Sequence, residues 1–205
     1  MPPPPATTKP RAHGRSALAS FRDAAKALQA AHAIFASPPL FAPSIANRDQ
    51  LKRFFDEVAT EEAAGAPRVW IPDGLWEPRA AVKFAGELGV TCAIDPLVYD
   101  PATPAEVYED LEAESLYFRI VGLGRSGLIR DEKLEDLAGL VEHYGAIDLT
   151  IAFASPARWP DARNFRKLVG AGDDGALGVP PGAGDGDASL DDDSDGDQDA
   201  DQDQE

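Results

Sequence analysis

Short apolar runs alternate with segments of helical periodicity along most of this chain, and that order restricts the fold more than any other feature. Apolar residues recur at helical spacing around and between the runs, beginning with Leu18, Phe21, Ala25 and Leu28. Strands that alternate with helices are joined by right-handed crossovers and form a parallel sheet. We therefore predict an α/β fold of parallel βα units. Its predicted strands are 32–36, 68–71, 90–94, 115–122 and 148–153.

Several predicted helices have recognisable ends. Asn47 is expected to cap one helix, with Gln50 at its third position in a box-like arrangement. The helix predicted over 79–88 is closed by Gly89. Residues 103–106 read Thr-Pro-Ala-Glu, a cap followed by proline at the first helical position. Further helices are expected at 131–144 and 160–169.

The fourth predicted strand, 115–122, carries one charge in an otherwise apolar run. Alternation puts Tyr117, Arg119 and Val121 on the same face. A parallel strand covered on both faces is usually apolar throughout, and an unpaired buried charge is very costly. Arg119 is therefore expected to meet a carboxylate or a ligand anion.

Polar side chains are expected to gather beyond the carboxyl ends of the strands, where parallel sheets hold their ligands. Arg119 with Asp95 or Asp73 is the best candidate for a polar centre. One interpretation is a buried structural ion pair; the other is a clamp for an anion or carboxylate. The candidate catalytic residues are Asp95 and Asp73, which could act as acid and base if burial raised one pKa. The candidate binding residues are Arg119, Tyr117 and Arg125.

Composition excludes several classes of partner. The net charge of −17 is concentrated in residues 173–205, which hold thirteen acids and no base. No basic patch favours nucleic acid, and no apolar run approaches the roughly 18 residues of a membrane span. The N-terminus lacks the apolar core of a signal peptide. A single cysteine, Cys92, fits a reducing compartment, so a cytoplasmic location is expected.

The chain divides by composition into three parts. Residues 1–15 are predicted to be a disordered proline-rich arm, 16–170 the α/β domain, and 171–205 a disordered acidic tail with almost nothing to bury. Asp191, Asp193 and Asp195 resemble the opening of a calcium loop. Because glutamine replaces glutamate at its twelfth position, a solvated tail is favoured over a calcium site.

No cofactor or metal is predicted. Residues 122–127 match G-x-G-x-x-G, but a dinucleotide site needs a helix that begins at this turn, and the expected cap, Asp131, comes later. A strand-to-helix loop is favoured, with Arg125 able to contact an anion. The three histidines do not cluster with acids at the spacing of metal ligands.

Five segments together resemble the C-terminal part of the YecE-like domain of unknown function, a TIM-barrel-like family. The resemblance covers about residues 18–170 and implies the last five βα units of a barrel. The segments are Phe35-Ala-Ser-Pro-Pro-Leu-Phe41, Leu51-Lys-Arg-Phe-Phe55, Ala93-Ile-Asp95, Tyr117-Phe-Arg119 with Gly122, and Ile151-Ala-Phe-Ala-Ser155.

The polar positions of that family are largely replaced in this chain. Val121 stands where the family carries a histidine, and residues 69–75 lack its glutamate, arginine and histidine, although Trp76 is kept. The resemblance therefore implies a non-catalytic or degenerate protein that acts by binding or association. The alternative is a small hydrolase acting on a sugar or phosphate ester through Asp95, Asp73 and Arg119.

Five strands cannot close an eight-stranded barrel. We expect an incomplete TIM-barrel-like sheet that has lost an N-terminal half, the alternative being an open doubly wound sheet. An open fragment would expose Trp70 or Tyr117, which soluble domains avoid. We expect the burial of these side chains to be restored in one of three ways: by self-association, by a partner chain that completes the barrel, or by rearranged N-terminal segments.

Overall fold

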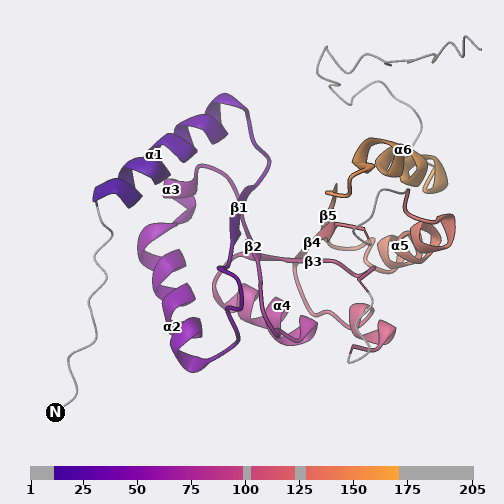
Figure 1. Cartoon of the computed structure of the whole chain (residues 1–205), viewed down its shortest axis with the longest axis horizontal. Helices are drawn as coiled ribbons and strands as arrows, with labels where there is room; N and C mark the ends of the chain where they lie inside the picture. The colour runs from indigo at the N-terminus through magenta and orange to yellow at the C-terminus, as the bar shows by residue number, and fades with distance from the viewer. Residues whose placement is uncertain (1–11, 99–102, 123–127, 171–205) are drawn as a thin grey trace, which may run out of the picture. The chain divides into compact units, whose positions relative to one another are not determined.

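The computed structural model describes residues 12–98, 103–122 and 128–170, and within them it confirms the predicted α/β class. Five parallel strands form one sheet, in the order β1-β2-β3-β4-β5. Figure 1 shows these strands with the helices that connect them. The strands are β1 (Ala33–Ala36), β2 (Arg68–Ile71), β3 (Thr91–Ile94), β4 (Ser115–Ile120) and β5 (Asp148–Phe153). The helices are α1 (Ala12–Ala27), α2 (Ile45–Arg53), η1 (Phe54–Val58), α3 (Glu61–Ala64), α4 (Pro78–Glu87), η2 (Ala105–Tyr108), α5 (Asp131–His143) and α6 (Arg158–Leu168).

The sequential strand order identifies how the sheet is wound. A doubly wound sheet reverses its order at a switch point, and no reversal occurs among these five strands. Sequential parallel strands with crossovers of one hand place all helices on one face. The sheet is thus singly wound, as in βα barrels, and it is open, with β1 and β5 as its edges.

The two faces of the sheet are packed differently. On one face, Trp70, Phe118 and Ile120 join a large apolar core that includes residues of α4, α5 and α6. On the other face, a small cluster of Val69, Ala93 and Tyr117 contains no helical residue. The helices therefore cover one face only.

Trp70 and Tyr117 are nevertheless buried, with 1% and 6% of their surfaces exposed. Trp70 lies under the helices, and its Nε1 donates to Ser37 Oγ at 2.8 Å. The Tyr117 ring meets the ring of His32, which precedes β1, edge to face at 5.3 Å. A residue next to β1 thus reaches β4 across the helix-free face, so the chain itself covers Tyr117 there.

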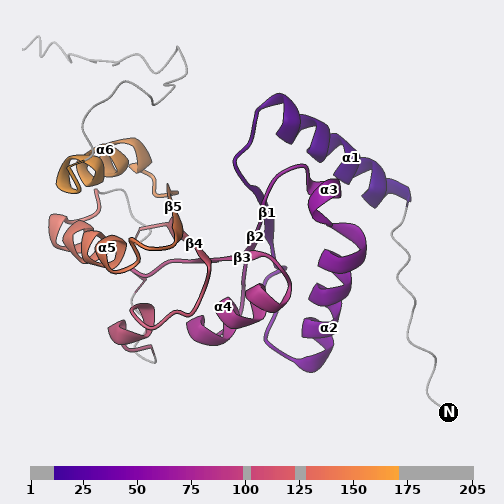
Figure 2. The same cartoon turned by 180° about the vertical axis from the view of Figure 1, so that it is seen from behind.

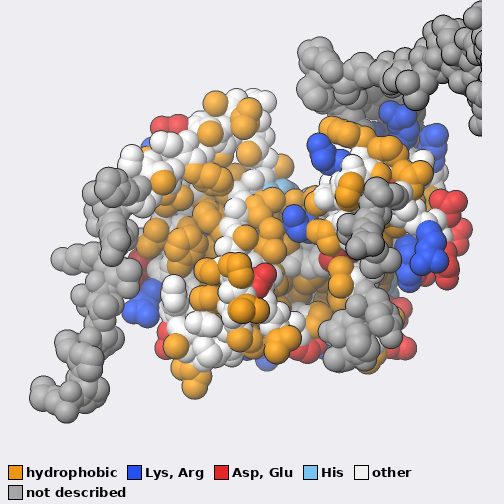
Figure 3. Space-filling model, in the orientation of Figure 1, with side chains coloured by type: hydrophobic (Ala, Val, Ile, Leu, Met, Phe, Trp, Pro, Cys, Tyr) orange, Lys and Arg blue, Asp and Glu red, His pale blue; other side chains and the backbone are white. Residues whose placement is uncertain are grey.

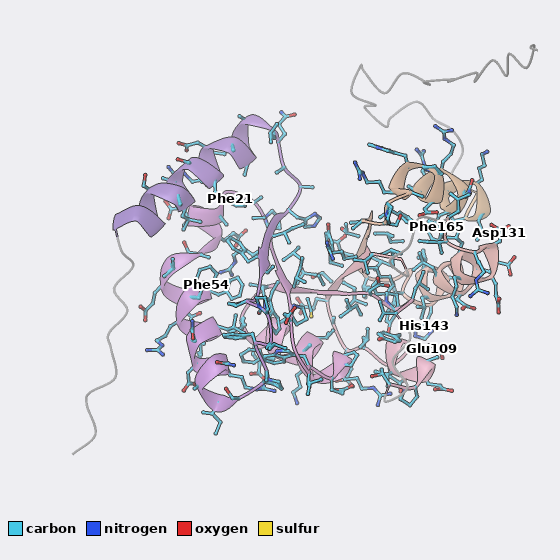
Figure 4. All side chains as sticks on the ribbon, viewed as in Figure 1. Phe21, Phe54, Glu109, Asp131, His143 and Phe165 are labelled. Carbon is cyan, nitrogen blue, oxygen red and sulfur yellow. The ribbon has the colours of Figure 1, made fainter. Side chains whose placement is uncertain are left out.

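An aromatic cluster centred on Phe35 joins β1 to the N-terminal helices. The Phe35 ring lies 5.7 Å from Phe21 of α1, 5.7 Å from Phe54 and 5.8 Å from Phe55 of η1. Figure 4 labels Phe21 and Phe54 on this side of the sheet, and α1, α2 and α3 stay grouped there in the reverse view (Figure 2). Helix α1 begins at Ala12, so it includes residues 12–15 of the segment that the sequence analysis assigns to the proline-rich arm.

Two helix ends differ from their prediction. Ser44, not Asn47, caps α2: its hydroxyl accepts from the Asn47 backbone N–H at 3.2 Å, while the Asn47 amide donates to Ala42 O. The predicted helix after Thr103 is only the 3₁₀ turn η2; Pro104 occupies its N-cap position and makes no side-chain capping hydrogen bond.

The described residues contain no helix long and apolar enough to cross a membrane. On the face drawn in Figure 3, apolar side chains lie over the N-terminal helices, while lysine and arginine side chains gather around α6. The rest of the predicted arm, the acidic tail and its calcium-loop pattern lie outside the described residues.

Candidate functional site

A pocket of about 320 Å³ opens at the carboxyl ends of β2, β3 and β4, the edge at which the sequence predicts a site. Its titratable lining residues are Asp95, Arg119 and Tyr108. The rest of the wall is mostly apolar. It consists of Ile71, Pro72, Gly74, Trp76, Pro78, Ala81, Ala93, Ile94, Val98, Thr103 and Val121.

The sheet register brings Asp95 and Arg119 together. Ala93 pairs with Tyr117 and Ile94 with Phe118, so Asp95 and Arg119 follow on neighbouring strands and on the helix-free face. Both Asp95 oxygens accept backbone N–H groups, Oδ2 from Val121 at 2.7 Å and Oδ1 from Leu97 at 3.0 Å. Asp95 thus ties together the loops that leave β3 and β4.

Burial raises the pKa of Asp95, and this is the largest influence on it. The two backbone N–H donors oppose the rise, and the charge of Arg119 opposes it more weakly. Burial also raises the pKa of Tyr117, again against the charge of Arg119. Asp95 is therefore a half-buried carboxyl, and each of its oxygens accepts a backbone N–H.

Arg119 lines the pocket without a close carboxylate partner among the described residues. The ion pairs found there are Arg22–Asp23, Arg79–Asp110 and Lys133–Asp136, and none includes Arg119. Its side chain is partly exposed. Of the two predicted interpretations, the structural ion pair is not found among the described residues, and the clamp for an anion or carboxylate stays a prediction.

The other predicted site residues lie elsewhere. Asp73 is exposed and does not line the pocket; its Oδ1 accepts from Leu40 N at 2.6 Å, which ties the loop after β2 to the loop after β1. Tyr117 lies one pleat before Arg119 on the same face, outside the pocket wall. Arg125 lies outside the described residues, as does most of the G-x-G-x-x-G segment.

Trp76 forms an aromatic wall that the sequence reasoning did not assign to the site. Its Nε1 donates to Phe41 O at 2.7 Å, and its ring stacks on Phe84 with centroids 5.6 Å apart. The guanidinium of Arg48 lies 5.0 Å from the Trp76 ring centroid. The Pro-Asp-Gly turn after β2, which brings a tryptophan back to the sheet edge, was the signal available for it.

A second polar cluster at this edge is structural. Asp161 has none of its surface exposed; its Oδ2 accepts from Ser155 Oγ at 2.5 Å and its Oδ1 from Ile129 N at 2.9 Å. It thereby joins α6 to the loop after β5 and to the segment before α5. Gly122, at φ +69°, lies against Ser155 and leaves room for this arrangement.

A larger hollow of about 620 Å³ lies at the opposite end of the strands, where the Thr91 and Ser115 hydroxyls are 2.7 Å apart. Cys92 lines it, but burial raises the pKa of this thiol to about 12, so the thiolate does not form near neutral pH. The described residues contain no group of three or more acids, histidines or cysteines placed to hold a metal ion.

Comparison with known proteins adds no assignment: no family model, curated protein or solved structure matches the chain. The resemblance to the YecE-like domain therefore stays a prediction.

Proposed function

We propose that this protein is a degenerate, non-catalytic YecE-like domain that acts by binding a ligand in the Arg119 pocket. One observation carries the proposal: among the described residues, Asp95 is the only carboxylate that lines the pocket, and both of its oxygens accept backbone N–H groups. A partly exposed guanidinium beside it can bind an anion, whereas paired acid–base chemistry would need a second carboxylate that the described wall does not contain. The cytoplasmic location expected from the single cysteine belongs to the same proposal.

The hydrolase alternative is weaker for a specific reason. Two-carboxylate hydrolysis needs both groups to flank the bond that breaks, one as acid and one as base or nucleophile. Asp95 has the raised pKa expected of an acid. Asp73 is held by Leu40 N and is not part of the pocket wall. The described part of the pocket wall therefore lacks the second carboxylate that the alternative requires.

The proposal predicts that Arg119→Met keeps its fold and that the protein has no hydrolase activity. Arg119 makes no ion pair among the described residues, so its loss should change the free energy of unfolding by less than about 1 kcal/mol. Urea unfolding measures this. Nitrophenyl phosphate and nitrophenyl glycosides should show no turnover above buffer. Turnover that Asp95→Asn abolishes, while the exposed control Asp110→Asn does not, would establish the hydrolase instead.

We further propose that two copies of the chain associate at edge strand β1, on the exposed part of the helix-free face; the centre of that face, at Val69, Ala93 and Tyr117, is already buried. Parallel sheets normally have both faces covered, and here Ile34 of the edge strand β1 keeps 41% of its surface exposed on that face. Because five strands leave two unpaired edges, a second copy offers both an apolar surface and a strand partner.

Sedimentation equilibrium tests this association directly. The full chain should be dimeric at micromolar concentration, and Ile34→Asp should shift it at least tenfold toward monomer, because the substitution puts a charge at the exposed apolar position of edge strand β1. Leu168→Asp is the matched control, since Leu168 of α6 is 45% exposed and outside the sheet. A wild-type chain that stays monomeric contradicts the proposal.

A further inference from the structure

We propose that the ligand of the Arg119 pocket is a small monocarboxylate with an apolar body. This inference rests on the proposed binding function and names the chemical class that the pocket accepts. The carboxylate would lie on the guanidinium of Arg119, and the apolar body against the wall formed by Trp76, Pro72 and Pro78.

The guanidinium is available for such a contact. Asp95 lines the same pocket as Arg119, yet the Asp95 oxygens accept from Val121 N and Leu97 N. The charge of Arg119 influences Asp95 less than either backbone donor does. A guanidinium presents parallel N–H donors that match the two oxygens of a carboxylate, so the planar anion has a complementary partner that the protein does not already use.

The charges in the pocket favour one negative charge over two. Arg119 is the only cationic side chain in the described wall, and the Asp95 carboxylate lies beside it. A dianion such as phosphate would place its second charge near Asp95, where the described wall offers no second cation to balance it, and like charges at close range are repelled strongly when partly desolvated. A monoanion neutralises Arg119 and adds no uncompensated charge.

The wall opposite the charges selects an apolar body. The Trp76 ring is fixed before any ligand arrives, by its bond to Phe41 O and by its stacking on Phe84. A preformed wall costs little ordering when a ligand binds. The volume of about 320 Å³ is at the small end of the range for ligand pockets, which begins near roughly 300 Å³. The ligand should therefore be the size of an aromatic or short aliphatic acid.

Isothermal titration of the full chain with benzoate, hexanoate, inorganic phosphate and benzyl alcohol tests this class. Benzoate or hexanoate should bind the wild type, and Arg119→Gln should weaken that binding at least tenfold. Phosphate, which lacks the apolar body, and benzyl alcohol, which lacks the charge, should each bind at least tenfold more weakly than the better acid. Arg163→Gln on α6, which removes an exposed arginine outside the pocket, should leave binding unchanged.

The outcomes separate this inference from the function on which it rests. If phosphate binds better than both acids and Arg119→Gln abolishes it, the pocket binds anions but the ligand class is wrong. If the acids bind equally well to Arg119→Gln, or do not bind at all, the inference is overturned. Hydrolytic turnover lost in Asp95→Asn would instead overturn the proposed binding function. Circular dichroism of Arg119→Gln confirms that lost binding does not reflect lost fold.

Discussion

Replacing Asp161 with alanine should lower the free energy of unfolding by about 3 kcal/mol, one of the two largest effects expected in this protein. The Asp161 carboxylate is fully buried and accepts from Ser155 Oγ and from Ile129 N. Its loss leaves the buried Ser155 hydroxyl and the partly buried Ile129 N–H without acceptors, and an unsatisfied buried group costs about 1–3 kcal/mol. The connection between α6 and the two loops at its base is lost as well.

The midpoint of urea unfolding, with an unchanged slope, measures this loss. Asp161→Asn should lie between wild type and alanine, because one oxygen remains to accept while the amide nitrogen cannot. Asp136→Ala is the control: Asp136 pairs with Lys133 at 2.7 Å on the exposed side of α5 and should change stability by about 0.5 kcal/mol or less. Equal effects of Asp161→Ala and Asp136→Ala would show that the buried carboxylate does not hold these loops.

The element pattern could be predicted from the sequence because apolar periodicity is local information. The strands expected at 68–71 and 148–153 have those bounds in the structure. The helix ends were harder, since they depend on which polar side chain reaches a backbone N–H. Asn47 has the chemistry of a cap, but Ser44 lies one turn earlier and accepts the bond. The π-helical turn Phe54–Val58 has no periodic signature.

The candidate site could be predicted only in part, for a related reason. Asp95 and Arg119 come together because strand register puts them on adjacent strands, and register follows from the pattern. Asp73 and Trp76 follow β2 in one irregular loop, and their places depend on contacts with the loop after β1. Such contacts join residues more than thirty positions apart and leave no local trace in the sequence.

A second arginine, Arg68 at the start of β2, shows how a strand can hold a guanidinium without any acid. Its Nη1 donates to Phe55 O and to Ala59 O, each at 3.0 Å, and its Nη2 donates to Gly89 O at 3.0 Å. The first two carbonyls belong to the π-helical turn and its end, where a helix leaves acceptors without partners. Carbonyl oxygens, which the sequence argument did not consider, can therefore replace a carboxylate as the counterpart of a half-buried arginine.

Arg68→Met should accordingly lower the free energy of unfolding by about 2–3 kcal/mol, because three carbonyls lose a charged donor and the cation 5.7 Å from the Phe55 ring centroid is removed. Methionine keeps most of the apolar stem, so the effect isolates the guanidinium. Arg79→Met is the control, since Arg79 pairs with Asp110 at the surface and should matter by less than about 0.5 kcal/mol. Urea unfolding of both variants gives the comparison. If Arg68→Met is as mild as Arg79→Met, water satisfies the carbonyls and Arg68 is dispensable; a loss of the expected size would show that the three carbonyls need the guanidinium.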